Sequence, residues 1–193
     1  MDRATRLRMV GLVAVVVVVA VAVIVLYAVG VLVPKASAAA PSPLPRTYVN
    51  LTLTYDTSSG IANYSTPFIS MTAHTLITVT ITSHDPTASP LFVPWDNHVV
   101  GTVGGNETVN CGSGPRIVSV LPENDIAHTF TVLDAYYNVS IPIPPATSPS
   151  VPCVVTFQLE MNYSEMTTWG CVANCDNGLM AAGRMWGLLL ISG

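Results

Sequence analysis

Residues 77–82 read Ile-Thr-Val-Thr-Ile-Thr, and this alternation of apolar and hydroxyl-bearing side chains decides the class of fold. Successive side chains of a β-strand point to opposite faces, so the run predicts a strand with one buried, apolar face. The same alternation recurs at residues 49–55, 128–132 and 155–161, and an apolar run suited to a buried final strand covers 186–191. Clusters of Pro, Gly, Asn and Asp separate these runs. We therefore expect an all-β domain over residues 46–193, folded as an antiparallel β-sandwich with Greek key connections.

One stretch of this domain, residues 85–120, is long and only loosely patterned. We expect it to form an insertion between two strands.

The charge of the domain is sparse and mostly acidic. Ten of the 11 acidic residues lie after residue 45, against three of the 7 basic residues. A phosphate backbone is bound through clustered lysine and arginine side chains, so the composition argues against nucleic acid as a partner.

A charge-free apolar segment, residues 9–33, precedes the domain. As a helix it would be about 37 Å long, enough to cross a hydrocarbon core of about 30 Å. Three arginines within residues 1–8 place that end in the cytoplasm by the positive-inside bias. We therefore expect one transmembrane helix over 9–33 and a Pro/Ala/Ser-rich stalk over 34–45, with the β domain outside the cytoplasm. A cleaved signal peptide is the alternative, although its apolar region spans only about 7–15 residues.

Glycosylation sequons support the extracytoplasmic location. Five occur in the β domain, at Asn50, Asn63, Asn106, Asn138 and Asn162. We expect some of these asparagines to carry glycans.

The candidate functional residues are one histidine and a set of sulfur-containing residues in the last third of the chain. An imidazole, a thiolate and a thioether together suit copper, and electron-transfer copper sites use His and Cys with a weak axial Met. One ligand would come from a strand and the others from the loop between the last two strands. The candidates are His128, Cys171, Cys175, Met180 and Met185.

Residues 124–132, Asn-Asp-Ile-Ala-His-Thr-Phe-Thr-Val, resemble the cupredoxin strand that carries the first copper histidine. They are similar to the Asp-Val-Ile-His-Ser-Phe pattern of cytochrome oxidase subunit II. Residues 78–85 resemble the preceding cupredoxin strand, and Met185-Trp-Gly187 resembles the exit from the ligand loop into the last strand. The resemblance covers about residues 70–193, and it implies a cupredoxin-like sandwich that binds copper and transfers electrons.

The ligand loop fits two family patterns incompletely. Sulfocyanin-like proteins place His five residues after Cys and Met five residues later, whereas Met180 stands at the histidine position counted from Cys175. The binuclear centre of subunit II has two cysteines spaced like Cys171 and Cys175, but Leu179 and Ala182 occupy its next two ligand positions.

Both patterns contain a second ligand histidine, and this chain has none at the corresponding positions. The remaining histidines, His74, His84 and His98, are the candidates for replacing it. A site with two methionines is the alternative, and its soft ligands would favour Cu(I).

The four cysteines have competing interpretations, because cysteines outside the cytoplasm more often form disulfides than bind metals. Cys111 and Cys153 lack a ligand-like context, and we expect them to pair with each other, although other pairings stay open. Cys171 and Cys175 could form a short disulfide or could bind copper as thiolates.

The leading hypothesis is a membrane-anchored copper protein that exchanges electrons with a respiratory complex. A metal-free structural or interaction subunit of a membrane or surface complex is one alternative, and Cu(I) delivery to an oxidase is another. The sequence has no enzyme signature, although Asp125 and Asp134 could flank His128.

Overall fold

The computed structural model describes residues 43–89, 91, 94–173 and 185–193. The predicted transmembrane helix over 9–33 lies outside these ranges, as do Cys175 and Met180. Within the described ranges, no helix is long and apolar enough to cross a membrane.

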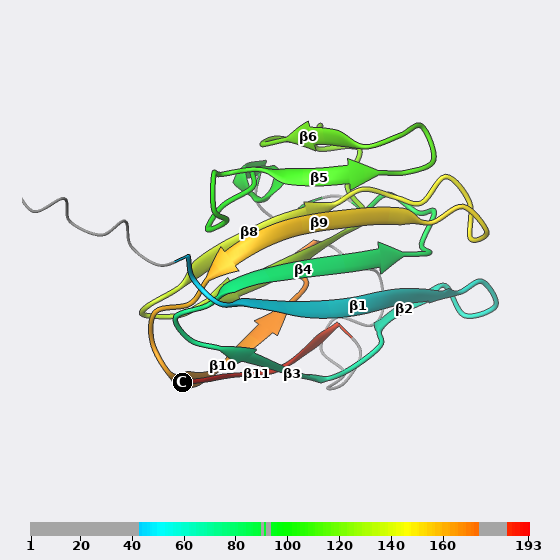
Figure 1. The fold of residues 1–193 in the computed structure, drawn as a ribbon. Helices are drawn as coiled ribbons and strands as arrows, with labels where there is room; N and C mark the ends of the chain where they lie inside the picture. Colours follow the sequence, from blue (N-terminus) through cyan, green and yellow to red (C-terminus); the bar gives the residue numbers. More distant parts are fainter. Residues whose placement is uncertain (1–42, 90, 92–93, 174–184) are drawn as a thin grey trace, which may run out of the picture. The chain divides into compact units, whose positions relative to one another are not determined.

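The described residues form two β-sheets that enclose one apolar core (Figure 1). The first sheet has six strands in the order β2-β1-β4-β9-β5-β6. Their bounds are β1 Arg46–Asp56, β2 Ile61–Tyr64, β4 Leu76–Ser83, β5 Glu107–Asn110, β6 Arg116–Val118 and β9 Cys153–Glu160. The second sheet has five strands in the order β3-β11-β10-β7-β8. Their bounds are β3 Phe68–Thr72, β7 His128–Leu133, β8 Asn138–Ile143, β10 Glu165–Gly170 and β11 Trp186–Ser192, and a short 3-10 helix, η1, covers Pro94–Asn97.

The predicted all-β sandwich is confirmed, but the sheets are mixed and not wholly antiparallel. β1 is parallel to β4, and β3 is parallel to β11. The first of these pairs arises because the chain leaves the first sheet after β2, adds β3 to the second sheet, and returns through β4 beside β1. Local alternation predicts strands and their buried faces, and it carries no information on this change of sheet.

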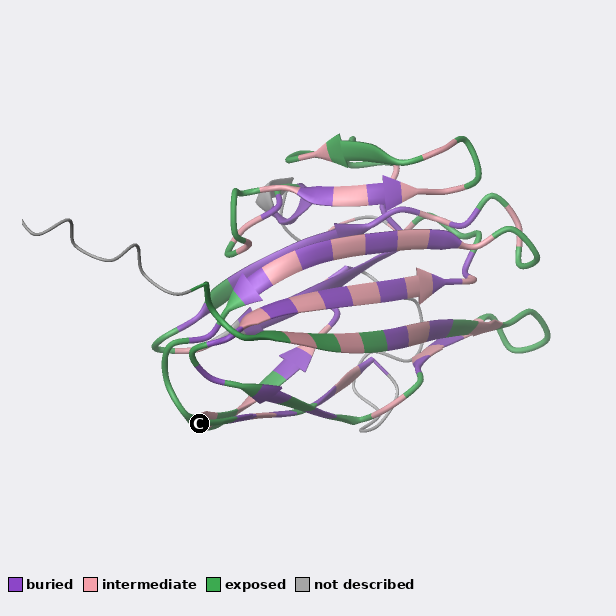
Figure 2. Ribbon diagram, viewed as in Figure 1, coloured by how far each residue is buried: buried purple, intermediate pink, exposed green. Residues whose placement is uncertain are grey.

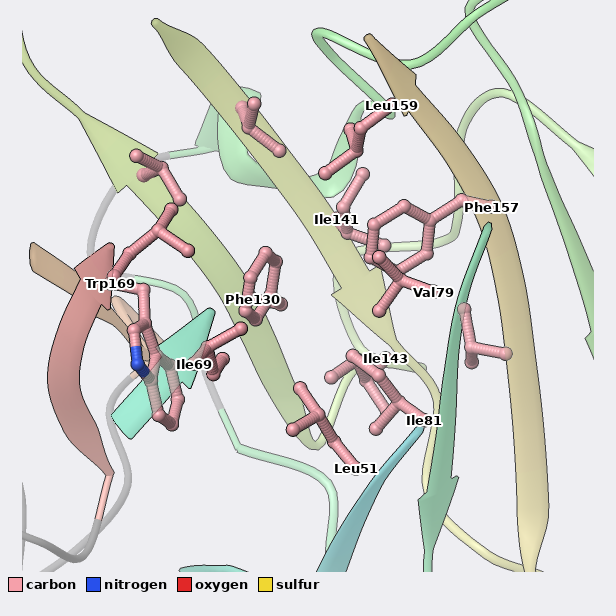
Figure 3. Packing of buried hydrophobic residues seen from close by; sticks show 14 of the residues in the cluster. Leu51, Ile69, Val79, Ile81, Phe130, Ile141, Ile143, Phe157, Leu159 and Trp169 are labelled. Atoms are coloured by element: carbon pink, nitrogen blue, oxygen red, sulfur yellow. The ribbon is translucent and has the colours of Figure 1, made fainter. Parts of the chain in front are cut away.

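The alternating pattern decides which side chains enter the core (Figure 2). In β4, Ile77, Val79 and Ile81 are fully buried, and the threonines between them are half-buried on the outer face. Ring contacts join the layers of the core (Figure 3). The Phe130 ring stacks on Trp169 at 5.7 Å between centroids and lies 5.9 Å from Phe157 of the opposite sheet.

The range 85–120, predicted as an insertion, contains η1, β5 and β6, and β5 pairs with β9. Glu107 of β5 points inward and is 1 % exposed, and neither carboxylate oxygen has a hydrogen-bond partner among the described residues. Burial raises the pKa of Glu107 to about 9, although nearby Arg116 lowers it in part. The native state therefore holds a neutral Glu107 at neutral pH.

Replacing Glu107 with glutamine is expected to stabilise the protein at pH 7 and to weaken the dependence of its stability on pH. The folded-state pKa of Glu107 is above the unfolded value, so the native state keeps a proton that the unfolded chain loses. Stability should therefore fall as pH rises from about 4.5 to about 9, by about 1.4 kcal/mol per pH unit for this group. Urea unfolding at pH 5 and pH 8 measures the slope, and equal slopes for the two proteins would contradict the neutral carboxyl.

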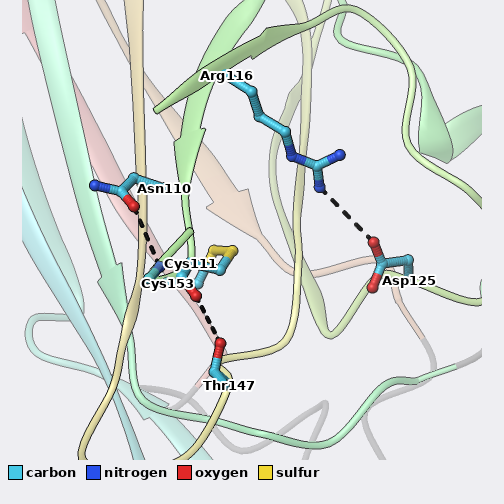
Figure 4. The surroundings of a disulfide bond; sticks show 7 residues. Asn110, Cys111, Arg116, Asp125, Thr147 and Cys153 are labelled. Carbon is cyan, nitrogen blue, oxygen red and sulfur yellow. Dashed lines mark hydrogen bonds and ion pairs between the residues drawn. A yellow bond between two sulfur atoms is a disulfide. The ribbon is translucent and has the colours of Figure 1, made fainter. Parts of the chain in front are cut away.

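The predicted disulfide between Cys111 and Cys153 is confirmed (Figure 4). It joins the residue after β5 to the first residue of β9, where Asn110 and Val154 are paired across the two strands. The Thr147 hydroxyl donates a hydrogen bond to the carbonyl oxygen of Cys111 at 2.6 Å. The cross-link thus ties a strand of the 85–120 range to the main sheet.

Replacing both Cys111 and Cys153 with alanine is expected to lower the free energy of unfolding by about 4 kcal/mol. The bridge closes a loop over a sequence separation of 42, and a loop of this length restricts the unfolded chain by about that amount. Chemical denaturation with and without reductant gives the comparison. A wild-type protein whose unfolding midpoint does not respond to reductant would contradict the prediction.

The five sequon asparagines differ in exposure. Asn50, Asn138 and Asn162 are exposed, whereas Asn63 and Asn106 are half-buried. The Asn106 side-chain amide also donates a hydrogen bond to the carbonyl of Gly104 at 3.0 Å. Glycosylation stays a prediction, and exposure favours the first three positions.

Candidate metal centre

His128 is the first residue of β7 and is 1 % exposed. The alternation of the strand turns it to the same face as the core residues Phe130 and Val132. The opposite face is buried as well, since Thr129 and Thr131 are 0 % and 4 % exposed. The Thr129 hydroxyl accepts hydrogen bonds from the backbone N–H of Val172 at 2.8 Å and from the Thr131 hydroxyl at 3.1 Å. Thr129 thereby fastens β7 to the segment that follows β10.

Cys171 comes directly after β10 and is 6 % exposed. Its sulfur lies 3.9 Å from Nδ1 of His128 and accepts a hydrogen bond from the backbone N–H of Thr129 at 3.4 Å. Its own N–H donates to the carbonyl of Met185 at 2.8 Å. Met185 is 2 % exposed and immediately precedes β11, so the two ends of the predicted ligand loop are joined beside His128.

A carboxylate occupies the other side of the histidine ring. Oδ2 of Asp85 lies 2.7 Å from Nε2 of His128, and both side chains are buried. Asp85 follows β4 by two residues, and its Oδ1 accepts a hydrogen bond from the N–H of Thr87 at 2.8 Å. The sequence reasoning missed this contact, although Asp85 ends the 78–85 segment that resembles a cupredoxin strand.

The two acids that could flank His128 in the sequence have other partners in the structure. Asp125 is 3.9 Å from Arg116 in an exposed ion pair (Figure 4). Oδ1 of Asp134 accepts hydrogen bonds from the N–H groups of Tyr136 and Tyr137 in the turn between β7 and β8. Asp134 follows the far end of β7, whereas Asp125 lies before the same end as His128 but faces Arg116 of β6.

The electrostatics of the site favour a positive charge. Burial lowers the pKa of His128, but hydrogen bonds and charge interactions with Asp85 and Cys171 outweigh it and raise the pKa to about 9. Burial, and then the negative charge of Cys171, raise the pKa of Asp96 in η1. The negative charges of Asp85 and Cys171 thus stabilise a positive charge in this buried site.

The donors that the structure brings together fit a copper ion. Zinc–imidazole and zinc–thiolate bonds add up to about 4.3 Å. At bond lengths of this size, the observed separation of 3.9 Å lets one ion contact both donors. Imidazole and thiolate are also the donor types that copper prefers. Among the described residues, no group of three His, Cys, Asp or Glu side chains forms a metal site. Cys175 and Met180 stay predicted ligands, because they lie outside those residues.

The histidines considered as a second ligand are engaged elsewhere or exposed. Nδ1 of His84 lies 2.9 Å from the carbonyl oxygen of Pro149. His74 is exposed in the turn between β3 and β4, with a φ of 56°, and His98 is exposed after η1. No contact found among the described residues joins any of them to His128 or Cys171.

Comparisons with known proteins gave only distant structural similarity. No family model matches the sequence, and no curated protein is significantly similar to it. A multicopper oxidase from Campylobacter jejuni has a TM-score of 0.45 and 10% identity, covering 79% of this chain and 31% of its own. McoA multicopper oxidase from Aquifex aeolicus has a TM-score of 0.39 and 10% identity, covering 77% and 30%. Auracyanin B has a TM-score of 0.33 and 10% identity, covering 79% and 96%. The chain thus spans less than a third of the two oxidases.

The class of fold is defined by the molecule itself. A buried histidine on β7, a cysteine at the end of β10 and the Trp186-Gly187 entry into β11 occupy the positions that the cupredoxin resemblance implies. The chain is therefore a cupredoxin-like β-sandwich with an imidazole and a sulfur donor side by side at one end of its second sheet.

Proposed function

We propose that this protein is a membrane-anchored, extracytoplasmic copper protein that transfers electrons, with a respiratory complex as its partner. The observation that carries the proposal is the 3.9 Å separation between Nδ1 of His128 and Sγ of Cys171 in a buried site. His128 and Cys171 would hold the ion, with Met185 as the described thioether candidate. Bound copper would supply the change between Cu(I) and Cu(II).

The scaffold around the two donors suits electron transfer. His128 lies on a strand that is buried on both faces, and Cys171 is held through its N–H and its sulfur. A rigid donor pair changes little between the two oxidation states, so the reorganisation that slows electron transfer is small. Burial also excludes water from the donor atoms.

Other features of the chain support the proposed membrane-anchored, extracytoplasmic location. The charge-free segment 9–33 has the length of a membrane span, and three arginines precede it. The disulfide between Cys111 and Cys153 is typical of an oxidising compartment. The sequon asparagines at 50, 138 and 162 are exposed, as glycan acceptors must be.

Copper loading of the full-length chain tests the proposal. A copper–thiolate site gives an intense visible absorption band and about one copper per chain by mass analysis, or two for a binuclear centre. Thiol counting under denaturing, non-reducing conditions on the same sample identifies the state of the cysteines. Absence of bound copper together with no reactive thiol would overturn the proposal and favour a metal-free interaction subunit.

A further inference from the structure

Asp85 is held by two hydrogen bonds besides its contact with His128. Its Oδ1 accepts the N–H of Thr87, and its backbone carbonyl accepts the N–H of Ala146 at 2.7 Å. The side chain is almost fully buried, so these contacts fix its direction. The second carboxylate oxygen, Oδ2, lies 2.7 Å from Nε2 of His128.

This contact decides which ring nitrogen can bind a metal. A carboxylate oxygen can only accept a hydrogen bond, so Nε2 of His128 must carry the proton that it donates to Asp85. In a neutral imidazole the other nitrogen then carries the lone pair that can bind a metal. That nitrogen is Nδ1, which lies 3.9 Å from Sγ of Cys171.

We propose that Asp85 is a positioning residue for copper, which keeps the proton of His128 on Nε2 and so presents Nδ1 to the ion. The inference rests on the copper-binding function proposed above. Outer carboxylates of this kind orient ligating histidines and make them more basic. Asp85 also places a negative charge behind the ligand, and this charge stabilises Cu(II) more than Cu(I).

The Asp85→Asn variant separates this role from a structural one. The Thr87 N–H would keep the asparagine oxygen in place of Oδ1, so the amide nitrogen would face Nε2 of His128. Two donors would then oppose each other, and the ring would be favoured with its proton on Nδ1, the nitrogen needed by copper. The substitution conserves size and the turn, so the fold should be maintained.

Copper affinity and reduction potential of the full-length chain provide the test. We expect Asp85→Asn to weaken copper binding about 10- to 100-fold. The loss of affinity should be larger for Cu(II) than for Cu(I). Each factor of ten between the two losses raises the reduction potential by about 59 mV. Asp56→Asn is the matched control, because Asp56 also accepts a backbone N–H two residues on, from Ser58 at 2.9 Å, but is exposed at the end of β1. It should leave both quantities unchanged.

A measurement on the wild-type protein covers the case in which the variant does not fold. In the Cu(I)-loaded form, nitrogen–proton NMR correlations should show His128 protonated at Nε2 and not at Nδ1, with slow exchange of that proton. Protonation at Nδ1, or an Asp85→Asn variant with unchanged affinity and potential, would overturn this role of Asp85 and leave the copper function standing. A wild-type chain that binds no copper would overturn both.

Discussion

The Cys171→Ala variant is expected to lose the visible copper–thiolate absorption and to bind copper more than about a hundredfold more weakly. Four-ligand structural zinc sites contribute about 10–16 kcal/mol, which sets the scale of one donor at about 3 kcal/mol. Cys171 is the sulfur that the structure sets beside Nδ1 of His128, and the N–H of Thr129 points at it. Absorption spectroscopy and competitive copper titration of the full-length variant measure the two effects.

The double variant Cys111→Ala/Cys153→Ala is the matched control for this experiment. It removes two sulfurs that are paired with each other, so the absorption band should persist although the protein is less stable. A Cys171→Ala protein that keeps the full band would mean that Cys175 alone is the thiolate. That result would contradict the site built around Cys171 and would retain the part of the sequence prediction that concerns Cys175.

The strands of the core could be predicted because their apolar faces are unbroken. Ile77, Val79 and Ile81 alternate with threonine, and the structure buries each of them completely. β5 could not be predicted in the same way, because its four residues, Glu-Thr-Val-Asn, place a carboxyl where the pattern requires an apolar side chain. Glu107 nevertheless points inward as a neutral group, which only its three-dimensional surroundings reveal.

The residues of the site also differ in whether the sequence could predict them. His128 and Cys171 could be proposed because copper requires an imidazole and a thiolate, and few residues of the chain offer them. Asp85 could not, because a turn aspartate after a strand usually serves the turn itself. Its Oδ1 does so through Thr87, and its second oxygen reaches a histidine that is 43 residues away in sequence. Such a contact depends on the packing of β4 against β7 across the sandwich.

The Gly187→Ala variant is expected to destabilise the protein by about 3 kcal/mol, the largest loss of stability expected from any single substitution proposed for this chain. Gly187 is a buried residue of β11, and a Cβ atom added to it would overlap the backbone carbonyl of Pro67. A backbone obstacle cannot move away by changing rotamer, so the strand itself must shift. The same carbonyl accepts the N–H of Leu188 at 2.8 Å, and a shift would weaken this link between β11 and the start of β3.

Gly170→Ala is the matched comparison, because Gly170 lies on the neighbouring strand and pairs with Trp186, beside Gly187. A Cβ atom there would approach the Trp186 Cβ to 3.1 Å, a tight contact that a small adjustment relieves. Its cost should stay below about 1 kcal/mol, since alanine also restricts the unfolded chain. Urea denaturation of the two variants gives the difference. Equal stability of the two would show that β11 can move away from Pro67, and the close approach would then not be the reason for glycine at the entry to the last strand.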